Sequence, residues 1–145
     1  MTEQRERLLK RRFHEAVSVQ PEIESLRVLL LELGGIQLVA PPRLDPTIPP
    51  LIVAGFVMAG SVQCIMMGES KCHQNAARVW SEKHQSVIGI GTGYALSEDG
   101  LWRQHSWGVL REGILETTVP RARYFGLLLQ GGDADLFAES NLNDI

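Results

Sequence analysis

One cysteine, one histidine and one glutamate have the types and the places in the chain that nucleophilic catalysis requires. Cys72 follows the turn-forming residues 68–70, and the segment after it has the spacing of a helix. A thiol in the first turn of a helix faces unpaired N–H groups and the positive end of the helix dipole, which lower its pKa. The same N–H groups can stabilise the oxyanion formed when a thiolate attacks a carbonyl. Cys72 is therefore the candidate nucleophile.

A thiolate nucleophile needs a general base, and the base needs a group that orients it. His105 opens a β-like segment, and Glu116 lies on the return segment after a turn at 111–113. An antiparallel hairpin of this length can bring the two side chains to one end of the same face. We therefore expect His105 to act as base and then acid, oriented by Glu116. His73 directly follows Cys72, and because neighbouring helical residues point about 100° apart, its ring is expected to point away from the thiol.

Four further residues are candidates for binding a substrate. Trp107 lies two residues after His105 on the expected strand, so the two side chains should face the same side. Trp107 is therefore expected to line the pocket, since an indole brings a large apolar area and one hydrogen-bond donor. Trp102 precedes the strand and is expected to form a mobile rim. Tyr94, from a glycine-rich segment, and Asn75, from the cysteine helix, complete the set.

The segments before residue 40 predict a helical hairpin. Within 3–17, apolar residues recur on one helical face opposite Arg and Glu. A second helix is predicted over 21–33, because a proline suits its first turn and Gly34-Gly35 can end it. The segment 41–50, which contains five of the seven prolines, predicts an extended connector.

The rest of the chain predicts a helix followed by a sheet. The apolar run 51–67 indicates two short buried strands, or a strand and a turn. Ser70 is suited to cap a helix over 71–83, and a short helix is predicted at 133–139. Composition predicts strands near 86–96, 103–110, 114–119 and 123–129.

Length and composition place these elements in one α+β domain. A chain of 145 residues can close one core but is short for two domains. The expected division is a hairpin at 1–40, a connector at 41–50, a core at 51–130 and an acidic tail at 131–145. The cysteine helix is expected to pack on an antiparallel sheet.

Charge and cysteine content narrow the functional classes. A net charge of −3 gives no general attraction for phosphate backbones, so a nucleic-acid partner is not expected. Two cysteines are too few for a disulfide-stapled secreted domain, and the charged N-terminus lacks a signal-peptide core, which favours the cytoplasm. The uncharged run 51–67 contains Gly, Ser and Gln and is at the short limit for a membrane span, so no membrane partner is expected.

The order of these motifs resembles the papain-like thiol-enzyme superfamily, which includes papain-type peptidases, NlpC/P60 amidases and transglutaminase-like proteins. The resemblance covers roughly 68–126 and rests on the cysteine-bearing segment 71–76, the strand 105–109 and the segment 116–118. The short sequences Gly93-Tyr94-Ala95 and Tyr124-Phe125-Gly126 also resemble those of small bacterial or phage members of this superfamily. The resemblance implies that 51–130 is a papain-like core, with Cys72 as nucleophile, His105 as base and Glu116 as the third polar residue.

By this resemblance the expected activity is that of a cysteine hydrolase or acyl transferase, which acts on an amide or thioester, such as a peptide, through a thioacyl intermediate. No cofactor is implied. Papain-type enzymes carry an oxyanion-hole glutamine six positions before the cysteine, whereas this chain has Met66 there and Gln63 as its nearest glutamine. That departure favours the alternative, a catalytically silent papain-like protein that binds a protein partner. Glu116 is also less usual in the third position than Asn, Asp or His.

A zinc site is a further alternative, but no cysteine or histidine pair has the close spacing of such sites. The residues from which it would draw are Cys64, Cys72, His73, His84 and His105.

Overall fold

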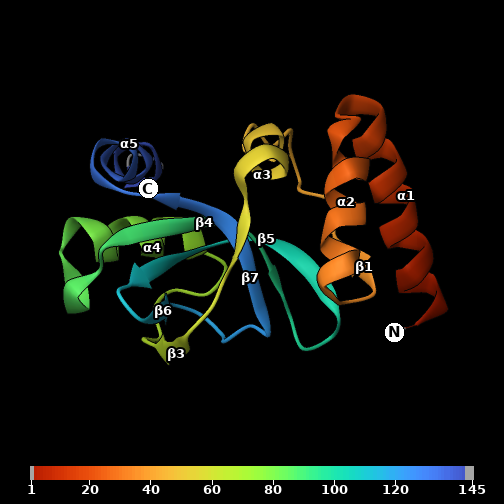
Figure 1. The fold of residues 1–145 in the computed structure, drawn as a ribbon. Helices are drawn as coiled ribbons and strands as arrows, with labels where there is room; N and C mark the ends of the chain where they lie inside the picture. The colour runs from red at the N-terminus through yellow and green to blue at the C-terminus, as the bar shows by residue number, and fades with distance from the viewer. Residues whose placement is uncertain (1, 143–145) are drawn as a thin grey trace.

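The computed structural model describes residues 2–142 and begins with two helices, α1 (Glu3–Val19) and α2 (Glu22–Leu33), which lie side by side (Figure 1). Thr2 caps α1, because its hydroxyl oxygen accepts a hydrogen bond of 3.1 Å from the backbone N–H of Arg5. Pro21 precedes α2, and Gly34 ends it with a φ of 140°. The predicted helical hairpin is therefore present.

The segment after the hairpin differs from the expected connector and strands. A short strand, β1 (Gln37–Leu38), is followed by a helix, α3 (Ile48–Ala54). Proline is tolerated in a first helical turn because the N–H that it lacks would have no partner there, so two prolines can stand in the first turn of α3. The expectation of a strand from residue 51 was wrong, since a short apolar run fits a buried helix as well as a strand.

Two short strands follow α3, β2 (Phe56–Met58) and β3 (Ser61–Cys64). They form the two edges of the sheet, and all four residues of β3 are exposed. Phe56 and Val57 of β2 are exposed as well, so the expectation of buried strands was wrong for β3 and for all of β2 except Met58. An edge strand has a neighbour on one side only, so the hydrophobic composition of this run did not require burial.

The sheet has the strand order β2-β7-β4-β5-β6-β3. The strands between these edges are β4 (Gly89–Leu96), β5 (Leu101–Leu110), β6 (Gly113–Glu116) and β7 (Arg123–Leu129). They pair antiparallel, as predicted, whereas β3 pairs parallel with β6 and β1 pairs parallel with β5. The fold is α+β with a curled, mixed sheet.

Apolar residues fill two main clusters, one on each face of the sheet. In the first, Leu26 and Leu30 of α2 pack against Tyr94 and Trp102 of the sheet. The second, on the opposite face, contains Trp107, together with Met58, Ala95, Ile114 and Tyr124. Alternating residues of a strand face opposite sides, so Trp102 and Trp107 of β5 belong to different clusters.

The cysteine-bearing helix α4 (Cys72–Ser81) packs on β5 and on the final helix α5 (Gly131–Leu142), as Figure 1 shows. A 3-10 turn, η1 (His84–Ser86), follows α4. Ser70 does not cap α4: Lys71 takes the cap position, and Ser70 adopts a left-handed conformation with φ of 58°. The helix at 133–139 is longer than predicted, and residues 143–145 of the acidic tail lie outside the described residues.

Among residues 2–142, none of the helices has both the length and the apolar composition that crossing a bilayer requires.

Candidate active site

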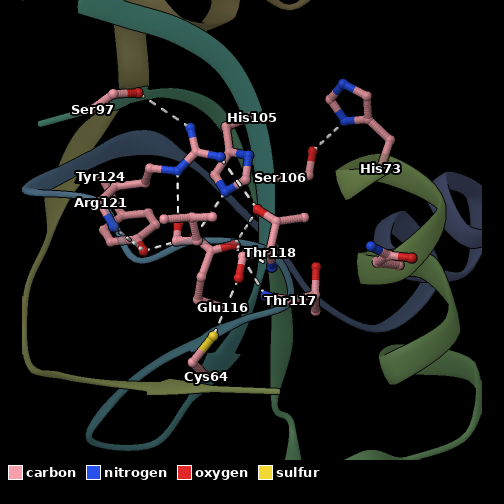
Figure 2. Close-up of polar contacts among 12 residues, drawn as sticks. Cys64, His73, Ser97, His105, Ser106, Glu116, Thr117, Thr118, Arg121 and Tyr124 are labelled. Atoms are coloured by element: carbon pink, nitrogen blue, oxygen red, sulfur yellow. Dashed lines mark hydrogen bonds and ion pairs between the residues drawn. The ribbon is translucent and has the colours of Figure 1, made fainter. Parts of the chain in front are cut away.

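Glu116 is a buried carboxylate at the end of β6 that accepts five hydrogen bonds. Its Oε2 accepts from the backbone N–H groups of Thr117 at 3.0 Å and Thr118 at 2.9 Å, and from the Thr118 hydroxyl at 3.0 Å. Its Oε1 accepts from the Tyr124 hydroxyl and from His105, both at 2.8 Å (Figure 2). Burial raises the pKa of Glu116, but these hydrogen bonds, led by that from His105, outweigh it and lower the pKa to about 2. Glu116 is therefore ionised at neutral pH.

The hairpin of β5 and β6 brings His105 to Glu116. Its register pairs Gly108 with Leu115 and Val109 with Ile114, which leaves Glu116 opposite Trp107, two residues from His105 on the same face. The Nε2 atom of His105 lies 2.8 Å from Oε1 of Glu116. The predicted proximity of these two side chains is present in the structure.

The carboxylate determines how His105 can act. An ionised carboxylate only accepts hydrogen bonds, so Nε2 of His105 carries a proton and Nδ1 remains for the thiol. Burial lowers the pKa of His105, but hydrogen bonds with Cys72 and Glu116 outweigh it and raise this pKa. The imidazolium form is therefore favoured beside Cys72.

Cys72 reaches His105 where one side of β5 is open. Within residues 2–142, β1 pairs with β5 at Leu101–Trp102 and β6 pairs with it at Gly108–Leu110, so no strand covers this side between them. The N-terminal end of α4 lies here, where Cys72 is partly exposed and its thiol is close enough to His105 for the imidazole to lower its pKa. Burial raises the pKa of Cys72, but hydrogen bonds with His105 and His73 outweigh it and lower the pKa to about 5. Cys72 is thus a thiolate at neutral pH.

His73 does not point away from the thiol, contrary to the sequence-based expectation. Its imidazole is close enough to Cys72 to lower the pKa of the thiol, and its Nδ1 lies 2.6 Å from the hydroxyl oxygen of Ser106 (Figure 2). The 100° between adjacent Cα–Cβ directions does not fix where the ring lies, because two rotatable bonds separate the ring from the backbone.

Asn75 and Trp107 support the site from within the core. Asn75 is buried, and its side-chain amide donates a hydrogen bond of 2.8 Å to the carbonyl oxygen of Gly68, which fixes the turn before α4. Trp107 is fully buried and stacks on His105 with ring centroids 5.9 Å apart. Trp107 therefore backs the imidazole, as its strand parity predicted.

Trp102 and Tyr94 lie on the other face of the sheet from His105. Trp102 is fully buried within β5 and donates a hydrogen bond to the Gly34 carbonyl, so it is not the mobile rim that the sequence suggested. The hydroxyl of Tyr94 donates to the buried carboxylate of Asp45. The structure therefore does not bring these two side chains to Cys72.

Sequence reasoning missed several residues that complete the site. Tyr124 and Thr118 hydrogen-bond to Glu116, and Ser106 hydrogen-bonds to His73. Ser106 and Thr118 are small polar residues beside the predicted histidine and glutamate, and that adjacency was the only signal in the sequence. Tyr124 comes from β7, so only the folded sheet places it here.

A hollow in the surface lies away from this site, between α1 and the segment 39–44. Apolar residues such as Val19 and Pro41 line it together with charged ones such as Arg12. The residues that line this hollow come from α1, the start of α2 and the segment 39–44, and not from the candidate site.

Metal binding has no support in the described residues, among which no three His, Cys, Asp or Glu side chains are grouped to hold an ion. Comparisons with protein-family models, curated proteins and solved structures found no match.

Proposed function

We propose that the protein is a papain-like cysteine hydrolase or acyl transferase that acts on an amide or thioester through a thioacyl intermediate on Cys72. The observation that carries this proposal is the position of His105, whose Nε2 bonds to a buried carboxylate and whose imidazole lies close enough to Cys72 to lower the pKa of the thiol. The paired arrangement is the one that activates a thiol nucleophile.

In the proposed reaction, the Cys72 thiolate attacks the carbonyl carbon and forms a C–S bond, while the carbonyl electron pair moves to oxygen. Nδ1 of His105 then donates its proton to the leaving amine or thiol as the scissile bond breaks. In the second half of the reaction, water or an acceptor amine attacks the thioester carbonyl and gives a proton to His105. The C–S bond breaks, the acid or new amide leaves, and the thiolate is restored.

The start of α4 supports stabilisation of the oxyanion. In the described part of the chain, no side chain caps this helix. Within that part, the backbone N–H groups of its first turn therefore have no side-chain partner and face the region of the sulfur. An oxyanion formed on a carbonyl bound to Sγ would lie close to these donors.

The topology agrees with the papain-like assignment, since a cysteine-bearing helix packs on a sheet whose strands carry the histidine and the carboxylate. Bound substrate would reach Cys72 from its exposed side, because His105, Glu116 and Trp107 are buried behind it.

The proposal can be tested with p-nitrophenyl acetate, a small activated acyl donor that needs no specific pocket. We expect an acetyl group on Cys72 by peptide mass mapping, formed faster than on Cys64 and lost when hydroxylamine is added. Cys72→Ala should abolish this adduct, and His105→Ala should slow it by at least tenfold. Transfer of the acetyl group from Cys72 to water alone would indicate a hydrolase. Faster loss of the acetyl group from Cys72 when glycinamide is added would indicate a transferase.

Acetylation of Cys64 and Cys72 at equal rates, or a rate in His105→Ala equal to that of the unmodified protein, would contradict the proposal. The catalytically silent binding protein would then be the better description.

A further inference from the structure

Arg121, in the loop between β6 and β7, contacts both of the hydroxyl groups that bond to Glu116. Its Nη2 donates a hydrogen bond of 3.2 Å to the hydroxyl oxygen of Thr118, and its backbone N–H donates one of 3.1 Å to the hydroxyl oxygen of Tyr124. These hydroxyls donate in turn to the carboxylate, Thr118 to Oε2 at 3.0 Å and Tyr124 to Oε1 at 2.8 Å (Figure 2). One residue therefore reaches both oxygens of Glu116, each through one hydroxyl group.

The contacts with Arg121 determine the direction of the two hydroxyl protons. A hydroxyl group has one proton to donate, and its oxygen can also accept. Arg121 offers only N–H donors to Thr118 and Tyr124, so both hydroxyl oxygens must accept from it. The proton of each hydroxyl is then free to point at Glu116. Arg121 thus fixes both hydroxyls as donors to the carboxylate.

The guanidinium of Arg121 is itself held in place. Its Nε donates a hydrogen bond of 2.8 Å to the carbonyl oxygen of Val119, and its Nη1 lies 3.4 Å from the hydroxyl oxygen of Ser97, in the turn between β4 and β5. The backbone N–H of Ala122 also bonds to the carbonyl of Leu96, at 2.8 Å. A guanidinium presents its donors in a rigid planar fork, so these contacts fix its orientation as well as its position. The loop is therefore tied to a second turn of the sheet.

The carboxylate that this loop holds is the one that bonds to His105. Oε1 of Glu116 accepts from only two side chains among the described residues, Tyr124 and His105, both at 2.8 Å. Tyr124 also packs beside the imidazole, with ring centroids 6.2 Å apart, and against Trp107, with ring centroids 5.0 Å apart. Glu116 and Tyr124 are both buried, so water does not take the place of either donor. The direction from which Nε2 of His105 can bond therefore depends on how Tyr124 and the loop are held.

We propose that Arg121 is a positioning residue of this site, which fixes the hydroxyl groups of Thr118 and Tyr124 as donors to Glu116 and so holds the carboxylate in the orientation that orients His105. This inference rests on the proposed function, because the orientation of His105 matters to a reaction only if His105 serves Cys72. Arg121 acts through Glu116 and does not touch the reacting atoms in this role.

The test follows the Nε2–H group of His105 by NMR at pH 7, in protein labelled with ¹⁵N-histidine. Its resonance is assigned by its loss in His105→Ala. Arg121→Ala should speed exchange of this proton with water roughly fivefold, which is what one ordinary hydrogen bond is worth. Arg121→Lys should have a smaller effect, because an ammonium can still donate to the Thr118 hydroxyl.

A second pair of variants separates positioning from general stability. Thr118→Val removes the hydroxyl that joins the guanidinium to Glu116, so Arg121→Ala should add little to the exchange rate in that background. Arg123→Ala is the matched control, because Arg123 is an exposed arginine two positions away, and it should leave the exchange rate unchanged. Thermal unfolding selects variants that remain folded, and Arg121→Lys and Thr118→Val carry the test if Arg121→Ala does not fold.

Acetylation of Cys72 by p-nitrophenyl acetate links this position to the reaction, and Arg121→Ala should slow it roughly fivefold as well. Unchanged exchange of the His105 proton in folded Arg121→Ala, or an effect of Arg121→Ala that adds fully to that of Thr118→Val, would overturn the inference. If His105→Ala slows acetylation while Arg121→Ala changes neither exchange nor acetylation, the inference fails and the proposed function stands. If Arg121→Ala speeds exchange while His105→Ala leaves acetylation unchanged, the proposed function fails and the positioning of His105 by Arg121 stands.

Discussion

The thiol of Cys72 and the thiol of Cys64 have opposite electrostatic surroundings. The imidazoles of His105 and His73 lower the pKa of the Cys72 thiol and outweigh burial, which raises it. Burial and the nearby charge of Glu116 both raise the pKa of Cys64. Because only the thiolate reacts with iodoacetamide, the two cysteines should differ strongly in reactivity at neutral pH.

We therefore expect iodoacetamide to label Cys72 faster than Cys64 at pH 7, with a midpoint for Cys72 near 5. The sign follows from the lowered pKa: the thiol is protonated and slow below the midpoint and reactive above it. His105→Ala should move the midpoint toward the ~8.5 of a free thiol. Mass-mapped labelling rates measure both effects, and equal rates at the two cysteines would show that Cys72 is not activated.

Glu116→Gln should destabilise the fold, although an amide oxygen can still accept from His105. Both carboxylate oxygens accept from donors, so the amide nitrogen of glutamine must face at least one N–H or O–H group. We expect a loss of roughly 2–4 kcal/mol in the free energy of unfolding, measured in urea. Tyr124→Phe, which removes one of the five bonds, should cost only about 1 kcal/mol.

The carboxylate of Glu116 should also make the stability of the fold depend on pH. Because the pKa of Glu116 is lowered in the folded state, its contribution is present above the ordinary value of 4.5 and is lost as the pH falls toward 2. Urea unfolding between pH 5 and 2 should show a shallower loss for Glu116→Gln than for the unmodified protein. Parallel losses would show that other groups cause the acid sensitivity.

At the scale of elements, the start of α4 depends on a turn that is fixed from within the helix. Asn75 of α4 reaches back to the carbonyl of Gly68, and within residues 2–142 no side chain caps the helix start. The position of Cys72 therefore depends on a hydrogen bond made one turn further along. Asn75, expected from the sequence to contact substrate, instead orders the segment that carries the nucleophile.

Asn75→Ala should lower both stability and the reactivity of Cys72. Loss of the buried bond leaves the Gly68 carbonyl without this donor and should cost about 1–3 kcal/mol in the free energy of unfolding. Cys72 labelling at pH 6 should slow because the thiol is less firmly held at His105. Gln74→Ala, at the neighbouring half-buried position, is the matched control and should change little. A stable variant with unchanged labelling would contradict this role for Asn75.

At the scale of the whole molecule, the N-terminal hairpin is part of the main core. Leu26 and Leu30 of α2 are fully buried in the same cluster as Tyr94, Trp102 and Phe125 of the sheet. This cluster lies on the face opposite His105, so the hairpin supports the sheet from behind and does not contact the imidazole. Removing the hairpin would expose that face to water.

Truncation before Pro41 should therefore cause aggregation or loss of cooperative unfolding, measured by size-exclusion chromatography and thermal circular dichroism. In the full chain, Leu26→Ala should cost roughly 2–5 kcal/mol through the cavity that it leaves. Val28→Ala, at a half-exposed position of the same helix, should cost less than about 0.5 kcal/mol. A truncated protein as stable as the full chain would show that the hairpin is an independent appendage.

The sequence by itself determined the parts that depend on local pattern. The hairpin register of β5 and β6 brings His105 and Glu116 together across a short turn, so strand parity and turn position sufficed to predict their contact. The helix that starts at Cys72 and the two N-terminal helices also follow from helical periodicity and stop signals. These features need few contacts between residues that are distant in the chain.

Only the tertiary structure decided the rest, because long-range packing selects among conformations that local patterns leave open. The run from residue 51 fits a helix or a strand, and packing of Leu51 in the first apolar cluster accompanies the helix. The sheet also decided that Trp102 is buried away from His105 and that Tyr124 of β7 bonds to Glu116. The ring of His73 has several allowed rotamers on an isolated helix, and it bonds to Ser106 because β5 brings that hydroxyl within reach.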